Sequence, residues 1–311
     1  MLTLPQTALI GAFALAASAA SAADLAPLVA PADLEAALDE VRVIDIRSAE
    51  NDGFGRGHVP GAASAPYQLF RGPAENPGAI VAPDALEQTY RELGLETADH
   101  VVITYQGSDV TDFGAAARVY WTLKSSGFED LSILNGGVNA WIEAGYELSN
   151  ASTEVEASDI EVTWNDRWTA TVDDVQQAIG GEDEALLLDA RSESFWEGRQ
   201  SHPAAAKPGT LPQSQYFEHA GWFSDGPAIV DADAARDIAI EQDFTDAEAI
   251  ISFCNTGHWA ATNWFALSEL AGIENVKLYP ESMVGWSNAG YEMANVPGPL
   301  RVMWNKITSA F

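Results

Sequence analysis

The chain has 311 residues, of which 46 are acidic and 15 basic, so its formal net charge at pH 7 is −31. A surface of this charge repels nucleic acid and anionic lipid, and neither is an expected partner. The length allows two domains of ordinary size, each with its own core. The single cysteine, Cys254, cannot form an internal disulfide, so it is either buried and inert or retained for its thiol chemistry.

The N-terminus has the pattern of a secretory signal. Residues 8–17 form a short apolar run, and residues 20–22 (Ala-Ser-Ala) match the pattern that precedes a cleavage site. Residues 1–7 contain no Lys or Arg, so only the amino terminus supplies positive charge there. We expect a signal peptide over residues 1–22, cleavage near Ala22 and a periplasmic or secreted protein; the alternative is an apolar N-terminus without this role. No later stretch is long and apolar enough to span a membrane, so no membrane partner is expected.

The chain contains an internal repeat. Four blocks recur in the same order: an apolar strand ending in Asp-x-Arg-Ser, a Gly-x-x-Pro segment, a second apolar strand and a Trp-x-x-Ala-Gly-Tyr-Glu segment. The two copies of these blocks lie at 43–48 and 187–192, 57–62 and 209–214, 101–105 and 249–253, and 140–147 and 285–292. Four matched blocks in a fixed order indicate a tandem duplication.

Each copy has the pattern of an α/β domain. Short apolar runs alternate with helix-like segments such as residues 32–38 and 172–179. This alternation predicts a parallel sheet with helices on both faces. The predicted fold class is therefore α/β, with two tandem domains of this kind. The connector 149–158 is polar and lacks a core pattern, so we place the first domain at 23–148 and the second at 159–311.

The two copies differ most after the second apolar strand. In the second copy this strand leads to Cys254, a short loop with one glycine, and a helix-like run over 259–270. A cysteine at such a turn lies beside the unpaired N–H groups of the helix start, where a thiolate is stabilised. In the first copy Gln106 occupies this place, in a loop that the spacing makes four residues longer. The sequence thus predicts one reactive site, in the second copy.

With these features the chain resembles the two-domain rhodaneses, the thiosulfate and mercaptopyruvate sulfurtransferases, over essentially all of its predicted mature length. The resemblance rests on the paired Asp-x-Arg-Ser strand ends, the segment 58–62 (His-Val-Pro-Gly-Ala), the pair 136–137 (Gly-Gly) followed by Trp141, and a cysteine loop in the second domain only. It implies that Cys254 accepts a sulfur atom as a persulfide, and that the next five residues surround this sulfur with backbone N–H groups. These five residues are Asn255, Thr256, Gly257, His258 and Trp259.

Departures from the family pattern leave the sulfur donor open. In the resemblance, thiosulfate-specific members carry basic loop residues and mercaptopyruvate-specific members carry small ones, and this loop matches neither pattern. Phe195 stands where the resemblance predicts a substrate-binding arginine, and Arg199 or Lys207 is a candidate replacement. Asp189 and Arg191 are candidates for substrate contact, although we prefer a structural pair that holds the loop.

The expected function is transfer of a sulfane sulfur in two half-reactions. The Cys254 thiolate attacks the donor, and a thiol, a cyanide-like acceptor or an acceptor protein then removes the sulfur from the persulfide. No cofactor is required, and five scattered histidines with one cysteine give no metal site. The alternative is a periplasmic sulfur carrier or binding protein with little turnover on small donors. A cysteine phosphatase is disfavoured because residues 255–262 contain no Arg or Lys to hold phosphate.

Several aromatic and imidazole side chains lie close to the cysteine or on connecting segments. His258 has two open interpretations: it tunes the thiolate or contacts the donor, or it bonds a backbone carbonyl. We expect Trp259 to line the pocket wall or the domain interface rather than to contact the reacting sulfur. His202 and His219 lie on connecting segments, where we expect them to be solvated.

Overall fold

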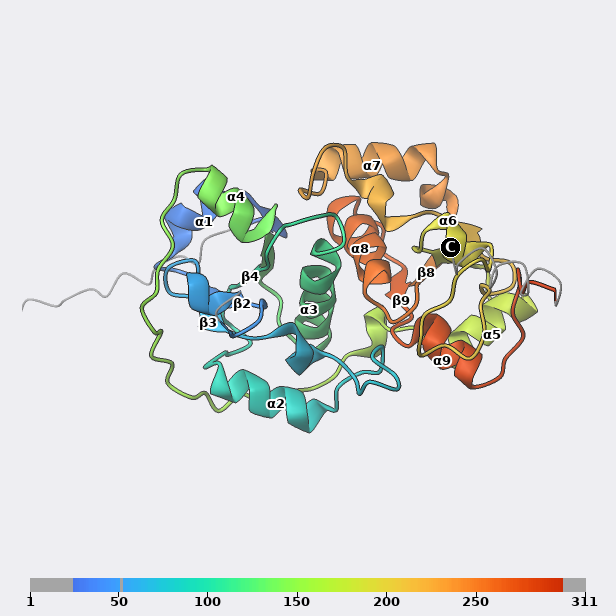
Figure 1. Ribbon diagram of the computed structural model, residues 1–311, viewed down its shortest axis with the longest axis horizontal. Coiled ribbons are helices and arrows are strands. Elements are labelled where there is room, and N and C mark those ends of the chain that lie inside the picture. Colours follow the sequence, from blue (N-terminus) through green and yellow to red (C-terminus); the bar gives the residue numbers. More distant parts are fainter. Residues whose placement is uncertain (1–24, 51–52, 299–311) are drawn as a thin grey trace, which may run out of the picture.

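The computed structural model describes residues 25–50 and 53–298. The predicted signal peptide and its cleavage site lie outside these residues. Within them the chain forms two lobes that lie side by side, each built on one sheet (Figure 1). Across the described part of the chain, no helix has both the length and the apolar character needed to cross a membrane.

The first lobe, within the described residues, contains five parallel strands in the order β1-β5-β4-β2-β3. Alternate residues of a strand face opposite sides of the sheet. Val102 accordingly packs on the side of α1 and α4, and Ile103 on the side of α2 and α3. The strands are β1 (Leu28–Val29), β2 (Arg42–Asp45), β3 (Ala63–Ser64), β4 (Val101–Thr104) and β5 (Leu131–Leu134), and the helices are α1 (Pro31–Ala37), α2 (Pro83–Glu92), α3 (Phe113–Ser125) and α4 (Gly137–Glu143).

The second lobe has, in the described range, four parallel strands in the order β7-β6-β8-β9. Leu187 packs on the side of α5 and α9, and Leu188 on the side of α7 and α8. The strands are β6 (Ala185–Asp189), β7 (Gln215–Tyr216), β8 (Ala249–Phe253) and β9 (Val276–Leu278), and the helices are α5 (Val172–Gly180), α6 (Glu193–Trp196), α7 (Ala232–Glu241), α8 (Trp259–Phe265), which continues as π-helix over Ala266–Leu270, and α9 (Ser282–Asn288). The predicted fold class, two parallel sheets each flanked by helices, is confirmed.

The repeat extends to individual side chains. Gly57 and Gly209 have the same φ of 131°, and each accepts a hydrogen bond from the arginine of its own Asp-x-Arg-Ser block. Trp141 and Trp286 each donate the indole N–H to the backbone carbonyl six residues further on. The two domains therefore have the same local structure at equivalent positions, so they can be compared residue by residue.

The pairing of the strands corrects one correspondence between the copies. The strands before the two loops pair through Thr104 and Phe253 with the aspartates of the repeated block. Tyr105 therefore takes the place of Cys254, and the prediction that Gln106 does so is wrong by one residue. Apolar strands of similar composition do not reveal their own register in the sequence; the burial of one face and the backbone pairing fix it.

The loop of the first copy is longer, as predicted, but by three residues rather than four. Residues 105–112 connect β4 to α3, whereas residues 254–258 connect β8 to α8. The extra length carries the loop to the second domain, where the carbonyl of Thr111 lies 2.9 Å from Nε2 of His258. A difference of four residues would require the two helices to start at matched positions, and they do not.

The two domains share one apolar core. Helices α3 and α8 face each other between the two sheets (Figure 1). The rings of Phe113 and Phe265 lie 5.4 Å apart, and those of Tyr120 and Phe265 lie 5.0 Å apart, both edge to face. Buried residues of both domains belong to a single cluster. Such close packing holds side chains of the first domain in a fixed position against the loop that follows β8.

Candidate active site

Cys254 lies directly after β8 and is only 1% exposed. Its backbone N–H donates to Oγ of Ser282 at 3.0 Å, and its carbonyl accepts from the N–H of Met283 at 3.1 Å. Ser282 has a φ of 51°, unusual for a residue with a side chain, and its hydroxyl donates to the carbonyl of Tyr279. The start of α9 therefore fixes the backbone at the cysteine, a role for Ser282 that the sequence did not indicate.

The loop after the cysteine has the arrangement of an anion-binding cradle. Within the described residues, the backbone N–H groups of residues 255–258 make no hydrogen bond to another protein group. The carbonyls of Thr256 and Gly257 accept from Nη1 of Arg71 at 2.9 Å and Nη1 of Arg118 at 3.4 Å. In a planar trans peptide the next N–H points opposite to the carbonyl, so the N–H groups of Gly257 and His258 face away from both arginines. Such unpaired N–H groups suit an anion.

Only glycine fits at position 257. Its φ is +67°, and an added Cβ would lie 2.6 Å from the carbonyl oxygen of Pro280 and would overlap the guanidinium of Arg118. A side chain here would therefore displace either the loop or the arginine. The one glycine of the loop is thus required by close contact with both domains.

Arg71 and Arg118, which belong to the first domain, supply the positive charge that the loop itself lacks. Arg118 is 1% exposed, its Nε is buried without a hydrogen bond, and within residues 25–50 and 53–298 neither guanidinium has a carboxylate within 4.0 Å. Burial and then the charge of Arg71 lower the pKa of Arg118 to about 9, which leaves it a cation at neutral pH. Buried charges are normally paired with carboxylates, but the hydrogen bonds of the buried Arg118 and the half-buried Arg71 go to backbone carbonyls, so their charge is not neutralised and favours an anion in the site.

Sequence reasoning missed these two arginines because it searched only near the cysteine. Arg71 follows the short helical turn Tyr67–Phe70, and Arg118 lies in α3, more than a hundred residues before the loop. One signal was present: Arg118 interrupts an otherwise almost entirely apolar and small-residue helix segment, 113–121. A charged residue on a helix face that must be buried is a functional candidate in its own right.

His258 is bonded through both ring nitrogens. Nε2 lies 2.9 Å from the carbonyl of Thr111, so it carries the proton and donates, and Nδ1 accepts from the hydroxyl of Tyr67 at 3.0 Å. Burial and then the charge of Arg71 lower the pKa of His258 to about 4. The ring is neutral at pH 7 and has no free nitrogen for a sulfur donor. This agrees with the interpretation that His258 bonds a backbone carbonyl.

Trp259 packs within the second domain. Its ring stacks on His219, with centroids 4.9 Å apart and planes 7° apart, and meets Phe195 edge to face at 6.0 Å. The expectation that His219 is solvated is wrong, because its side chain is only 4% exposed. Its backbone N–H and Nδ1 both contact the carbonyl of Ala190, which docks the segment on the end of β6. His202 is half-buried.

Asp189 and Arg191 form a buried ion pair at 2.7 Å that reaches the cysteine loop. Arg191 donates from Nη1 to Oδ1 of Asn255 at 3.3 Å and from Nη2 to the carbonyl of Gly209 at 2.9 Å. This is the geometry of a pair that holds the loop. The structure brings Arg199 to Glu193 and Glu197 instead.

Lys207 and Arg199 make no hydrogen bond or ion pair with the cysteine loop among the described residues. The cations that contact it are Arg71, Arg118 and Arg191. Nor do three His, Cys, Asp or Glu side chains gather anywhere in the described ranges closely enough to hold a metal ion. The site therefore combines one thiol, a ring of N–H groups and cations from both domains.

Comparison with known proteins places these features in a family context. The Rhodanese-like domain matches twice, at residues 30–144 and 171–289. The chain is 30% identical to a thiosulfate sulfurtransferase of Pseudomonas aeruginosa, covering 85% of this chain and 95% of that protein. It is 25% identical to a 3-mercaptopyruvate sulfurtransferase of Escherichia coli, covering 79% and 89%. The crystal structure of SseA from Escherichia coli superposes with a TM-score of 0.70 at 22% identity, covering 83% of this chain and 99% of that one.

Proposed function

The chain is a sulfurtransferase of the rhodanese family, and we propose that Cys254 carries the sulfur as a persulfide between a donor and an acceptor. One observation carries this proposal. The only thiol lies in a loop whose N–H groups are unbonded, against two guanidinium groups that have no carboxylate partner among the described residues. A persulfide anion would bond the N–H groups directly, while the two guanidinium groups on the carbonyl side of the loop add positive potential, and such interactions are strong in a site that excludes water.

The proposed reaction has two steps. In the first, the Cys254 thiolate attacks the outer sulfur of the donor, and the rest of the donor leaves with the electron pair of the broken bond. The persulfide Cys254–S–S⁻ then lies among the N–H groups of residues 255–258. In the second step an acceptor attacks the outer sulfur, and Cys254 leaves as the thiolate. The enzyme returns to its first state, and neither step requires a metal.

We propose an anionic donor, with thiosulfate preferred over mercaptopyruvate. Arg71 and Arg118 offer two positive charges close to the cysteine loop. A dianion gains more from such a pair than the monoanion mercaptopyruvate, since Coulomb energy scales with the product of the charges. The loop carries no cation of its own, so we place donor selection in the first domain.

Intact-mass measurement after incubation with each donor tests the proposal. Thiosulfate should add the mass of one sulfur atom to the wild type and none to Cys254→Ser, and mercaptopyruvate should load more slowly. Steady turnover with thiosulfate and cyanide then separates an enzyme from a sulfur carrier, which would load but not turn over. Sulfur found on the Cys254→Ser variant would contradict the proposal.

We also propose that the protein is exported and acts in the periplasm or outside the cell. The support is the apolar run 8–17 followed by Ala20, Ser21 and Ala22. N-terminal sequencing of the protein recovered from a periplasmic or culture-medium fraction should begin directly after Ala22 or Ala23. Recovery of the unprocessed chain in the cytoplasm alone would contradict export.

A further inference from the structure

We infer that His219 and Trp259 form the subsite for a thiol acceptor, in which Nε2 of His219 removes the proton of the thiol. This inference rests on the proposed function, since it concerns the second step of the same reaction. The inferred acceptor is a thiol, and the inferred base acts only in the second step, because the first step requires no base.

Two buried nitrogens on stacked rings carry the argument. Nε2 of His219 and Nε1 of Trp259 are both buried, and neither has a hydrogen-bond partner among the described residues. The rings lie 4.9 Å apart and are almost parallel. Buried polar atoms are rarely left unbonded in folded proteins, and such exceptions mark a ligand, a water or a catalytic group.

The two nitrogens have opposite hydrogen-bonding characters. Nδ1 of His219 lies 3.1 Å from the carbonyl of Ala190, so Nδ1 carries the proton and Nε2 is left with a free lone pair. The indole nitrogen of Trp259 can only donate. One group that both donates and accepts can satisfy the two nitrogens together, and a thiol is such a group. The dianions of sulfite and thiosulfate carry no proton and cannot donate to Nε2.

The surroundings keep the ring of His219 neutral. Burial lowers the pKa of His219 below its usual value, and the bond to Ala190 and the charges of Glu218 and Asp109 oppose this shift. Asp109 comes from the long loop of the first domain. His258, from the cysteine loop, is the other titratable group in electrostatic contact, and it is itself neutral. A neutral imidazole with a free Nε2 is the form that a general base requires.

His219 lies at the same sheet edge as the reactive cysteine. The carbonyl of Ala190 bonds His219, and the N–H of Ala190 bonds the carbonyl of Phe253, the residue directly before Cys254. Adjacent strands are about 4.8 Å apart, so the segment that carries His219, which docks on the end of β6, lies about one strand spacing from the end of β8. Trp259 connects His219 to the cysteine loop, because its ring stacks on His219 and its backbone directly follows the loop at the start of α8. Phe195 extends the same aromatic wall.

The step balances without an added oxidant or reductant. The thiol R–SH gives its proton to Nε2 of His219, and R–S⁻ attacks the outer sulfur of Cys254–S–S⁻. The S–S bond of the persulfide breaks, its electron pair stays on Cys254 as the thiolate, and R–S–S⁻ leaves. His219 then releases the proton to the product or to solvent. Without the base, only the few per cent of an alkyl thiol that is ionised at pH 7 can react.

The decisive variant is His219→Asn, because the Asn amide N–H can replace Nδ1–H at the carbonyl of Ala190 while the Nε2 lone pair is lost. Persulfide-loaded enzyme is mixed with free L-cysteine or with sulfite, and loss of the sulfur is followed by intact mass. At pH 7 the variant should transfer to L-cysteine about 30-fold more slowly than the wild type. Transfer to sulfite should stay within about twofold, because sulfite needs no base.

A pH profile gives a readout that a purely structural role would not move. The deficit of His219→Asn should shrink as the pH rises through about 8.5, where the thiol ionises by itself, and should be small at pH 7 for an aryl thiol, which is already ionised. His58→Asn is the matched control: His58 is a buried, stacked histidine of the first domain with both ring nitrogens facing carbonyls.

The outcomes separate the two proposals. Equal losses with L-cysteine and sulfite, or no loss with either, would overturn the role of His219 while leaving persulfide chemistry intact. A deficit that does not change with pH would overturn it as well. Failure of the wild type to load sulfur on Cys254 would instead overturn the proposed function itself.

Discussion

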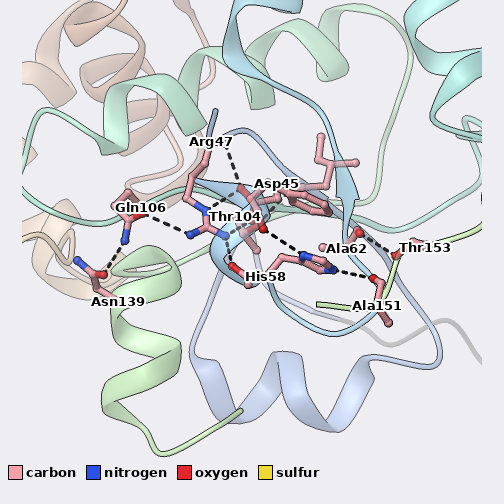
Figure 2. A network of polar contacts seen from close by, with 12 residues as sticks. Asp45, Arg47, His58, Ala62, Thr104, Gln106, Asn139, Ala151 and Thr153 are labelled. Carbon is pink, nitrogen blue, oxygen red and sulfur yellow. Dashed lines mark hydrogen bonds and ion pairs between the residues drawn. The ribbon is translucent and has the colours of Figure 1, made fainter. Parts of the chain in front are cut away.

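The carboxyl edges of the two sheets have the same framework and different contents. In the first domain Arg47 bonds Asp45, the carbonyl of Gly57 and the side chain of Gln106, which in turn bonds Asn139 (Figure 2). The second domain repeats this framework through its own Asp-Arg pair, Gly209 and an amide side chain in the cysteine loop. This framework fixes a loop in each copy, but only the loop of the second domain begins with a cysteine. The hydrogen bonds that hold the loop are therefore common to both domains, whereas the thiol occurs in one.

The copy without the cysteine contributes to the site from outside. Tyr67 and His219 occupy equivalent positions, since each donates its backbone N–H to the carbonyl that follows the repeated aspartate. Tyr67 contacts His258, and His219 contacts Trp259, so equivalent residues of the two copies hold successive residues of one loop. The first domain thus has the same framework without the cysteine, and it contributes side chains to the candidate active site of the second domain.

The largest expected effect is the loss of sulfur transfer on replacing Cys254, compared with replacing Tyr105, the residue that follows the matching strand of the first domain. Cys254→Ser should lower sulfur transfer at least about 1,000-fold, because it removes the nucleophile. The fold should remain, since the hydroxyl is nearly isosteric with the thiol. Tyr105→Phe, at the equivalent position of the first domain, should keep near wild-type activity. Turnover of thiosulfate with cyanide and circular dichroism measure both; comparable losses in the two variants would contradict the assignment.

The paired arginines give the next largest effect, on stability. Arg47→Met and Arg191→Met each leave a fully buried aspartate unpaired, and breaking such a pair costs about 3–5 kcal/mol of unfolding free energy. Urea unfolding should show similar losses for both. Sulfur transfer per folded molecule should fall only in Arg191→Met, because that guanidinium bonds Asn255 of the cysteine loop. An equal loss of transfer in Arg47→Met would mean that the frame of the first domain also controls the chemistry.

Arg118→Met tests whether the first domain supplies the charge for the donor. We expect kcat/KM for thiosulfate to fall about 30- to 100-fold, the effect of losing a charged hydrogen-bonding group. Lys124→Met is the control on the same helix, because Lys124 already has a carboxylate partner, Glu269, at 2.8 Å. Its kinetics with thiosulfate should stay near wild type. Similar losses in both variants would point to general damage at the domain interface.

The smallest effect is a pH dependence of stability that comes from His258. Its pKa is about 4 in the folded protein and 6.5 in the unfolded chain. The unfolded chain therefore binds the additional proton between these values, and stability is complete above pH 6.5 and decreases as the pH falls toward 4. His258→Gln keeps the N–H that faces Thr111. Between pH 7 and pH 5 its free energy of unfolding should decrease by about 1–2 kcal/mol less than that of the wild type. If urea unfolding gives the same difference in stability between the wild type and His258→Gln at pH 7 and at pH 5, this prediction is wrong.

The features that depend on local sequence pattern were predictable without the structure. Alternating apolar runs and helix-like segments gave two parallel sheets, because strand and helix periodicity follow from backbone geometry. The repeated Asp-x-Arg-Ser block identified a pair that is indeed buried and bonded to the loop in each domain. The only cysteine, after a strand and before a helix, was sufficient to predict where a reactive site would lie.

The charges and aromatic rings that surround that site could not be predicted, because they depend on how distant segments pack. Arg71 and Arg118 reach the loop because α3 packs against α8, and no pattern near residue 254 contains that contact. His219 reads as a solvated connector residue and is buried because its backbone docks on the end of β6. Contacts between distant segments depend on how whole faces pack, and burial then changes both the charge balance and the hydrogen-bonding needs of each group.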